Sequence, residues 1–401
     1  MNKNGPELID SKSKSFALFN ENIIYVSEIK KNNFSDNIEK IKNIPNKNNN
    51  KPANFKYNEK HKIIFFKKIE ILLLFYTINF IILNIKGILC DSFIIVKINK
   101  TGNRNIFFNE DVNGMGYCIP SSLQIPNSMT INGEAIAPPV GKYNLISQTN
   151  TIILHYDELK SSYQCLFFGY SDIDEIDTSN LNTSYVNSMK FMFAYCSSLT
   201  SINLLNLDTS HVLNMRNMFE GCTSLNPLDL SCFDTSSVQY FRNMFQECSS
   251  LVFLNLSNFY TKNGIEMHGM FYGCSALKYL DIHSFDITSA PSMGYMFYNC
   301  KSLESLYLSN FDTSNIRDMV NMFRNCQALT SLDLSHFDTS LVSDMRYMFY
   351  NCKNLVSLNL SNFNTTTTEK FDNMFYGCKS LKSLDLSHFN TENAVNMNVI
   401  N

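Results

Sequence analysis

The chain has 401 residues, with 12 Cys, 32 Phe and no Trp, and its nominal net charge of −3 is unevenly distributed. Residues 1–90 carry 15 Lys and 8 acidic residues, a balance of about +7, whereas residues 91–401 carry 18 Lys and Arg against 28 acidic residues, about −10. This acidic part argues against nucleic acid as a partner, because binding phosphates requires Lys and Arg to displace counterions.

Residues 1–62 are rich in Asn and Lys and contain no sustained apolar period. Such a segment cannot bury enough apolar surface to offset the entropy that ordering costs. We expect a disordered tail.

Residues 63–90 contain a run of 21 mostly apolar residues, 69–89, which as a helix would rise about 30 Å, enough to cross a bilayer. Four lysines precede the run: Lys60, Lys62, Lys67 and Lys68. The positive-inside rule then places the tail 1–62 in the cytoplasm and the residues after 90 outside. The segment 63–90 is predicted to be a transmembrane signal anchor. The alternatives are a buried soluble helix, or cleavage at Ile88-Leu89-Cys90, which would give a secreted protein.

Residues 91–165 alternate apolar and polar side chains in short runs, "SFIIVKIN", "SMTINGEAI" and "NTIILHY", separated by Gly, Pro and Asn. The pattern predicts a small β-rich unit placed where a repeat array needs a cap over its first open unit. Cys118 and Cys165 both lie in this unit. They form a disulfide in an exported protein or remain two unpaired buried thiols.

Residues 166–401 repeat with a period of 26. Met-Phe recurs eight times without insertion, from 192–193 to 374–375, and a Cys and a Leu follow each copy at fixed distances. A fixed period of this length is typical of stacked units that share one continuous core.

Each unit shows two apolar rhythms. Leu332 and Leu334 flank Asp333, the period-two pattern of a strand. Val342, Met345, Met348, Phe349 and Cys352 then fall at offsets 0, 3, 6, 7 and 10, which predicts a short helix or 3₁₀ turn. The intervening Asp-Thr-Ser predicts a cap and turn. The expected fold class is an α/β repeat solenoid of about eight strand–turn–short-helix units, a right-handed, leucine-rich-repeat-like array with a parallel sheet.

One cysteine recurs in each unit, and we expect these residues to form a packing ladder inside the array: Cys196, Cys222, Cys248, Cys274, Cys300, Cys326, Cys352 and Cys378. Equivalent positions on adjacent strands lie about 4.8 Å apart, too far for the Cβ–Cβ distance of a disulfide. The Cys-x-x-Cys spacing typical of zinc sites is absent, and no His accompanies each Cys as a base for a nucleophile.

The outward strand position gives a candidate binding face. Its members are Asn203, Asp229, Asn255, Asp281, Tyr307, Asp333, Asn359 and Asp385, with Phe253 and Tyr279 beside them. No two Asp residues are neighbours in this series, which limits repulsion across the sheet. The face is either a partner-binding surface or a solvated sheet face without a ligand.

No enzyme site is predicted. Asp-Thr-Ser occurs in aspartic proteases, but here it recurs at 208, 234, 312 and 338 in step with the repeat, so every copy is the same structural part. The sequence offers no paired acid and base, phosphate loop or metal spacing, and we expect no cofactor. His283, His336 and His388 are expected to be exposed loop residues.

The motif Met-Phe-x-x-Cys-x-x-Leu-x-x-Leu-x-Leu-Ser-x-Phe-Asp-Thr-Ser over 166–397 resembles the BspA-like leucine-rich repeat surface proteins, and more closely their mycoplasma-type repeat of unknown function. The resemblance implies a curved array on a cell surface that binds host, matrix or cell partners, and it implies no catalytic residues. Two turns depart from the motif, at Tyr260, Lys262 and Gly264 and at residues 286–288, and we expect only local deviations there.

The expected function is therefore that of a membrane-anchored surface protein that binds an extracellular protein or glycan. The alternative is an intracellular scaffold tethered to a membrane, in which free thiols would stay reduced. The sequence stops part-way through a ninth unit, which suggests self-association through an uncapped last unit or a truncated family member.

Overall fold

The computed structural model describes residues 16–19, 22–25, 92–107, 118, 125–136 and 141–395. The chain divides into two units, Met1–Phe80 and Ile81–Asn401. In the first unit β1 (Phe16–Phe19) and β2 (Asn22–Tyr25) pair antiparallel, so part of the segment expected to be disordered forms a strand pair. The predicted anchor 63–90 lies outside the described residues, and within them no helix is long and apolar enough to cross a bilayer.

The second unit begins with the β-rich segment. β3 (Ser92–Ile98) and β8 (Asn150–Tyr156) pair antiparallel, and in both strands buried and half-buried side chains alternate. β5 (Ser128–Ile131) and β6 (Glu134–Ile136) form a hairpin whose turn residues, Asn132 and Gly133, both have positive φ, as a type I′ turn requires. β4 (Gly102–Phe107) and β7 (Gly141–Leu145) form a separate antiparallel pair.

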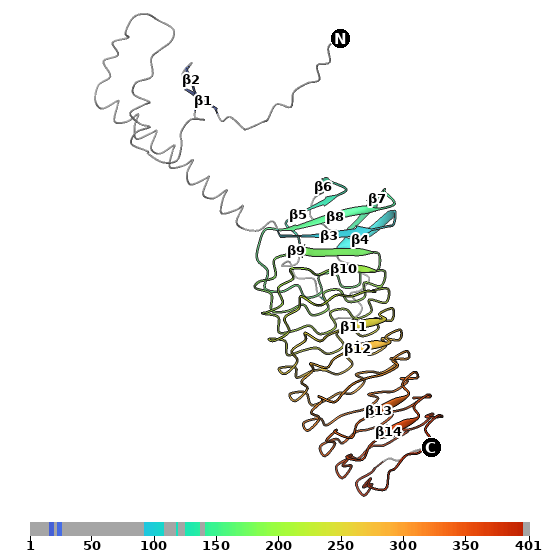
Figure 1. Cartoon of the computed structure of the whole chain (residues 1–401). Coiled ribbons are helices and arrows are strands. Elements are labelled where there is room, and N and C mark those ends of the chain that lie inside the picture. The colour runs from blue at the N-terminus through green and yellow to red at the C-terminus, as the bar shows by residue number, and fades with distance from the viewer. Residues whose placement is uncertain are drawn as a thin grey trace, which may run out of the picture. The chain divides into compact units, whose positions relative to one another are not determined.

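The sheet of this segment continues into the repeats. β3 pairs antiparallel with β9 (Glu175–Asn180), and β9 pairs parallel with β10 (Ser201–Asn203), which gives one six-stranded sheet in the order β10-β9-β3-β8-β5-β6 (Figure 1). The first repeat strand therefore has hydrogen-bonding partners on both sides. An open edge that would otherwise pair with another chain is covered.

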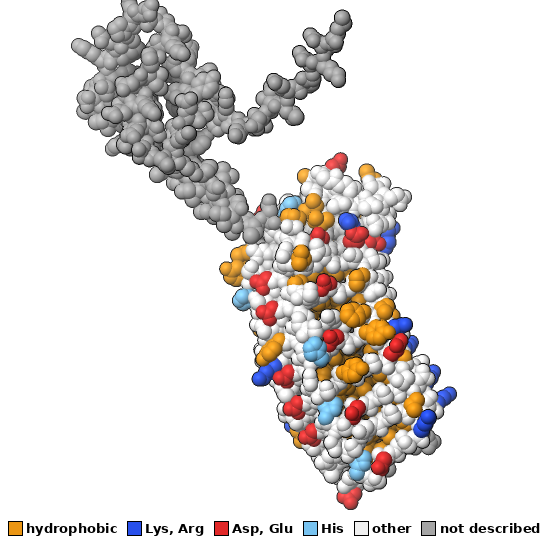
Figure 2. Space-filling model, viewed as in Figure 1, with side chains coloured by type: hydrophobic (Ala, Val, Ile, Leu, Met, Phe, Trp, Pro, Cys, Tyr) orange, Lys and Arg blue, Asp and Glu red, His pale blue; other side chains and the backbone are white. Residues whose placement is uncertain are grey.

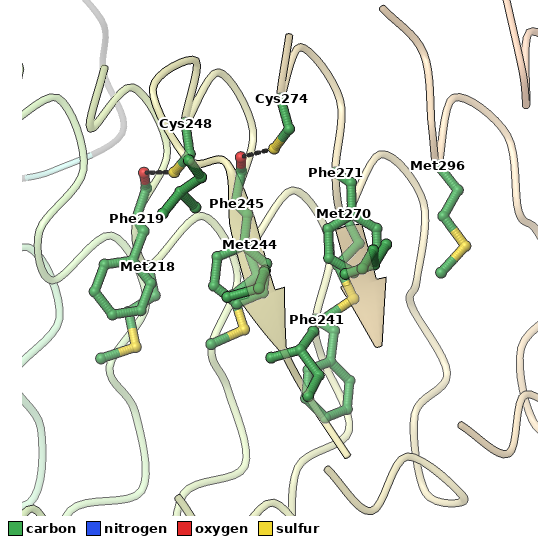
Figure 3. Packing of buried hydrophobic residues seen from close by; sticks show 14 of the residues in the cluster. Met218, Phe219, Phe241, Met244, Phe245, Cys248, Met270, Phe271, Cys274 and Met296 are labelled. Atoms are coloured by element: carbon green, nitrogen blue, oxygen red, sulfur yellow. Dashed lines mark hydrogen bonds between the residues drawn. The ribbon is translucent and has the colours of Figure 1, made fainter. Parts of the chain in front are cut away.

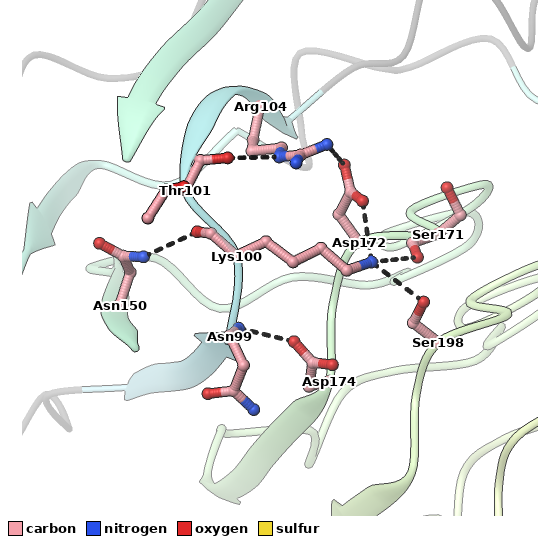
Figure 4. Close-up of polar contacts among 9 residues, drawn as sticks. All are labelled: Asn99, Lys100, Thr101, Arg104, Asn150, Ser171, Asp172, Asp174 and Ser198. Atoms are coloured by element: carbon pink, nitrogen blue, oxygen red, sulfur yellow. Dashed lines mark hydrogen bonds and ion pairs between the residues drawn. The ribbon is translucent and has the colours of Figure 1, made fainter. Parts of the chain in front are cut away.

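Polar side chains fasten the same junction (Figure 4). Lys100 Nζ lies 3.0 Å from an Asp172 carboxylate oxygen and donates to Ser198 Oγ at 3.2 Å, and Arg104 lies 3.4 Å from the other Asp172 oxygen. The Asn99 N–H donates to the Asp174 carboxylate at 2.7 Å. Because these groups are partly exposed, we expect them to fix orientation more than to add stability.

Beyond β10 the repeats stack as rungs, and equivalent residues 26 apart pair in parallel (Figure 1). Strands are short: β11 (Phe253–Asn255) pairs with β12 (Tyr279–Asp281), and β13 (Ser331–Asp333) pairs with β14 (Ser357–Asn359). On the opposite side of each rung single bridges join Ser162, Ser188, Asn214, Tyr240 and Glu266 in one run, and Ser292, Asp318, Asp344 and Lys370 in a second.

The predicted short helix is wrong, whereas single 3₁₀-type turns, the alternative, are present: the segment around Met-Phe is a ribbon of consecutive turns, and the described residues contain no helix. In the rung of Met348, the N–H groups of Met348, Tyr350 and Cys352 donate to carbonyls three residues back. The N–H groups between them, such as that of Phe349, donate instead to the next rung. Two residues per rung have positive φ in this ribbon, and most of them are Asn or Gly, which adopt that conformation at low cost. An α-helix would use all these donors internally and leave the rungs unjoined.

The core lies between the turn ribbon and the strands. Phe rings from Phe167 to Phe375 stack in one unbroken column, with centroids 5.5–5.9 Å apart. Figure 3 shows its part at Phe219, Phe245 and Phe271. Each ladder cysteine donates its S–H to the carbonyl of the Phe 29 residues earlier, at 3.1–3.2 Å. The cysteines are therefore small core residues that also tie one rung to the rung before it.

The Asp-Thr-Ser turns contain a third ladder. The buried Thr235 hydroxyl accepts from the Tyr260 N–H at 2.7 Å and donates to the Tyr260 carbonyl at 3.0 Å. The Thr261 hydroxyl makes the same two hydrogen bonds to the backbone of Asp286. The divergent turn at Tyr260 therefore keeps the hydroxyl link to the next rung. At the next rung Ile287 fills the threonine position and is buried without a hydroxyl, which is a local deviation within an otherwise continuous stack.

Candidate binding face

The outward strand residues form one exposed or half-exposed column along the stack: Asn203, Asp229, Asn255, Asp281, Tyr307, Asp333, Asn359 and Asp385. Parallel pairing sets neighbouring members opposite one another, with Asn255 against Asp281 and Asp333 against Asn359. Phe253 and Tyr279 are opposed in the same way two residues earlier, on the same side of the sheet. The structure thus brings the sequence-selected residues onto one face.

The carboxyl and amide groups of this column have a structural task. Each accepts a hydrogen bond from the N–H two residues on, as between Asp229 and Ser231 at 2.9 Å and between Asn255 and Ser257 at 2.9 Å. Such Asx turns end the strand locally, and Asn serves as well as Asp because only the acceptor oxygen is needed. The backbone bonds from Ser231 and Ser335 lower the pKa values of Asp229 and Asp333. The pKa values of Asp281 and Asp385 are lowered first by side-chain hydrogen bonds, from His283 and Ser387.

Tyr307 has no carboxyl or amide group for such a turn. Its side chain is 78% exposed, and Phe253 and Tyr279 on the preceding rungs are 56% and 52% exposed. Figure 2 shows hydrophobic side chains gathered over the part of the stack that carries β11 and β12. Three consecutive rungs therefore present large aromatic side chains to solvent, and aromatic residues are enriched where proteins bind partners.

Charged groups border this aromatic patch. Lys278 and Glu304 lie on the two rungs of Tyr279 and Tyr307, 3.8 Å apart. His283 is exposed and its Nδ1 lies 2.6 Å from the Asp281 carboxylate. His336 and His388 are exposed as well, and each also contacts a carbonyl of the preceding rung through Nε2, at 2.7 and 2.8 Å.

The ladder cysteines are not suited to reaction. Burial raises the pKa of every ladder thiol, so the thiolate that a nucleophile or metal ligand requires is disfavoured. Cys118 and Cys165 are joined in a disulfide, with Cα atoms 5.9 Å apart. Within the described part of the chain, no three His, Cys, Asp or Glu side chains converge as a metal site.

The Asp-Thr-Ser aspartates do not face one another across a cleft. Each accepts hydrogen bonds from the residue two places on in its own turn, as Asp312 does from the Ser314 N–H at 3.0 Å. Asp208 and Asp234 are equivalent residues of successive rungs, and the bonds from Ser210 and Ser236 lower their pKa values. Both carboxyl groups are thus held ionised as turn acceptors, whereas a protease pair shares a proton.

Sequence reasoning missed a second surface, on the turn ribbon. The position two residues after the repeated Met is occupied in five successive rungs by Tyr272, Tyr298, Arg324, Tyr350 and Tyr376. The signal was present in the same 26-residue period, but the predicted helices would pack about 8–10 Å apart, too far for side chains of successive rungs to stack.

Residues 161–279, 253–329 and 291–400 match the family described as "Mycoplasma protein of unknown function, DUF285". No curated protein and no solved structure matches the chain. The three matched segments together cover more than half of the sequence and all the described repeat rungs, and they confirm the predicted repeat. The chain belongs to this repeat family of unknown function.

Proposed function

We propose that this protein is a membrane-anchored cell-surface binding protein without catalytic activity, which recognises a partner protein through the strand face. The observation that carries the proposal is the aromatic patch of Phe253, Tyr279 and Tyr307, three large side chains kept in solvent on consecutive rungs of a rigid stack. Burying them in an interface supplies the hydrophobic part of binding, and Phe and Tyr lose little freedom on association because each has only two χ angles.

The proposed location outside the cell rests on the apolar run 69–89 and the lysines before it. The Cys118–Cys165 disulfide supports the same location, because disulfides persist in oxidising compartments. The family shown is the 26-residue repeat family, and we propose the finer assignment to its BspA-like surface members, with a right-handed, leucine-rich-type array whose Leu and Phe side chains fill the core. A membrane-tethered intracellular scaffold is the second candidate, favoured by the many free thiols of the ladder.

The test is adhesion of cells that express the full chain to a second cell layer or to extracellular matrix. The substituted chain carries Phe253→Ser, Tyr279→Ser and Tyr307→Ser. The matched control carries Tyr185→Ser and Tyr260→Ser, which remove exposed aromatic side chains elsewhere on the stack. Surface amount is measured by antibody for each variant.

We expect the strand-face variant to lose about tenfold or more in adhesion, since aromatic contacts each contribute on the order of 1 kcal/mol or more. The control should adhere like the unmodified chain. Equal adhesion of both variants, or no adhesion by the unmodified chain at full surface expression, would remove the strand face as a binding site.

A further inference from the structure

The turn ribbon carries a continuous stack of flat groups, here named the tyrosine–arginine stack: Tyr272, Tyr298, Arg324, Tyr350 and Tyr376. Tyr272 and Tyr298 stack with centroids 4.6 Å apart, and Tyr350 and Tyr376 with centroids 5.0 Å apart. The Arg324 guanidinium carbon lies 5.6 Å from the Tyr298 centroid and 4.5 Å from the Tyr350 centroid. A guanidinium takes the place of a ring in the stack, which its planar shape and charge allow.

The backbone fixes this order. The carbonyls of Tyr298, Arg324, Tyr350 and Tyr376 each accept from an N–H of the preceding rung at 2.7–2.8 Å. Rungs spaced about 4.8 Å apart give the stack a length of roughly 19 Å. It is a preformed linear feature, so a ligand would not have to order it.

Arg324 has unused donor capacity. Its Nη1 donates to Asn321 Oδ1 at 3.1 Å, and its Nε is buried with no hydrogen-bond partner among the described residues. The eight ion pairs found within the described part of the chain do not include Arg324. A guanidinium has five N–H donors and matches two oxygens of one carboxylate or sulfate.

The strip beside the stack is basic, in contrast to the acidic residues 91–401 as a whole. Lys301, Lys353 and Lys379 follow the ladder cysteines of their rungs and are exposed. The five rung segments 272–276, 298–302, 324–328, 350–354 and 376–380 hold these three lysines and Arg324, and no Asp or Glu. Glu247 lies at the start of the strip and interacts electrostatically with Lys301. Burial raises the pKa of the Glu247 carboxyl, and the positive charge of Lys301 lowers that pKa.

We propose that the tyrosine–arginine stack and its lysine strip bind an acidic glycan, a sugar chain that carries carboxylates or sulfates. Arg324 takes one acidic group through the N–H donors of its two Nη groups, because its Nε is buried, and the lysines interact with acidic groups further along the glycan. The tyrosines, of which Tyr376 is the most exposed, and the amides of Asn299 and Asn325, which bond to each other at 2.7 Å, offer hydrogen-bonding groups for sugar hydroxyls. The site lies on the turn ribbon and does not use the strand-face patch. The glycan-binding proposal is therefore tested independently of the proposed function.

The experiment uses the purified full chain in a neutral detergent, with immobilised heparin as the sulfated probe and hyaluronan as the carboxylated probe. Dextran serves as the neutral sugar control, and a single-stranded oligothymidine serves as a polyanion without the glycan chain. The variants are R324K, which keeps the charge but not the planar fork, and K301Q/K353Q/K379Q. The matched control is K262Q/K278Q/K382Q, which removes three exposed lysines outside the lysine strip. Thermal unfolding checks that every variant is folded.

We expect binding to at least one acidic glycan that weakens with added salt, little binding to dextran, and a loss of about tenfold or more in R324K and in the strip variant. Retention on heparin but not hyaluronan assigns sulfate as the recognised group, and retention on both assigns carboxylate, which both glycans carry. Three results would overturn the proposal: no binding to either acidic probe, equal losses in the strip and control variants, or binding of oligothymidine as strong as that of the glycans.

Discussion

The Cys248 thiol donates a hydrogen bond to the Phe219 carbonyl at 3.1 Å, across 29 residues of sequence and from one rung to the next. The same carbonyl accepts the Cys222 N–H at 3.1 Å within its own rung. The Phe219 carbonyl oxygen thus accepts two hydrogen bonds, one within its own turn and one from the adjoining rung. A side chain at this position must be small, apolar and able to donate, which only cysteine combines.

Cys248→Ala should lower the free energy of unfolding by about 1–2 kcal/mol, because it removes a buried sulfur and leaves a small cavity. The Phe219 carbonyl keeps its bond from Cys222, so no buried acceptor is left unpaired. Urea unfolding followed by circular dichroism measures the shift. Cys232→Ala is the control: its more exposed thiol also donates to the Leu204 carbonyl, at 3.2 Å, but removing it leaves no buried cavity, so a smaller loss is expected. A loss as large for Cys232 as for Cys248 would contradict the ladder role.

Stability should fall as the pH rises above about 9. Burial raises the folded-state pKa of the ladder thiols, that of Cys378 to about 11, above the ordinary value of 9.0. The unfolded chain therefore loses these protons first, and the stabilising difference present below pH 9 disappears as the pH passes upward through the folded pKa values. Urea midpoints between pH 7 and 10.5 under reducing conditions should decline, and less steeply in Cys248→Ala; parallel declines would contradict the assignment.

Thr235→Val should destabilise the stack by about 1–3 kcal/mol, since it leaves the Tyr260 N–H and carbonyl without their shared hydroxyl partner. Ile287→Val removes one methylene at the equivalent buried position, where no hydroxyl bridge exists, and should cost about 1 kcal/mol. Hydrogen exchange measured by mass spectrometry should show faster exchange of Tyr260 in the Thr235 variant alone. Unchanged exchange there would show that the hydroxyl bridge contributes nothing.

Asp312→Asn should change stability little at pH 7. Asn364 and Asn390, at the equivalent position of later rungs, close their own turns with an amide oxygen in place of the carboxylate oxygen. Asp312→Ala removes the acceptor and should cost about 1 kcal/mol. The hydrogen bonds from Ser314 lower the pKa of Asp312, so its contribution is present above about pH 4 and is lost as the pH falls through the folded pKa. In thermal unfolding, the stability difference between the Asn and Ala variants should therefore persist at acid pH. The stability advantage of the unmodified chain over the Ala variant should shrink as the pH falls, because Asp312 becomes protonated.

The sequence period was enough to predict the stack, because a register of 26 held over eight units permits only equivalent placement of equivalent residues. It also placed the strand column and the inward cysteines. The helix prediction failed at Val342–Cys352 because the 0, 3, 6, 7 spacing of apolar residues also fits turns whose every second N–H bonds the next rung. Asn and Gly at the positive-φ positions, such as Asn351, carried the contrary signal. Ring stacking around Arg324 depends on side-chain packing between rungs and follows from no single-unit pattern.

The central claim, a repeat stack displayed outside the cell, is tested most directly by accessibility on intact expressing cells. External protease and a membrane-impermeant biotin reagent are applied, and residues 1–62 and 166–397 are probed separately. The account predicts that the repeat is cut and labelled while the N-terminal tail is protected. A repeat that stays intact and unlabelled until the membrane is broken would contradict surface display and leave the intracellular scaffold as the function to pursue.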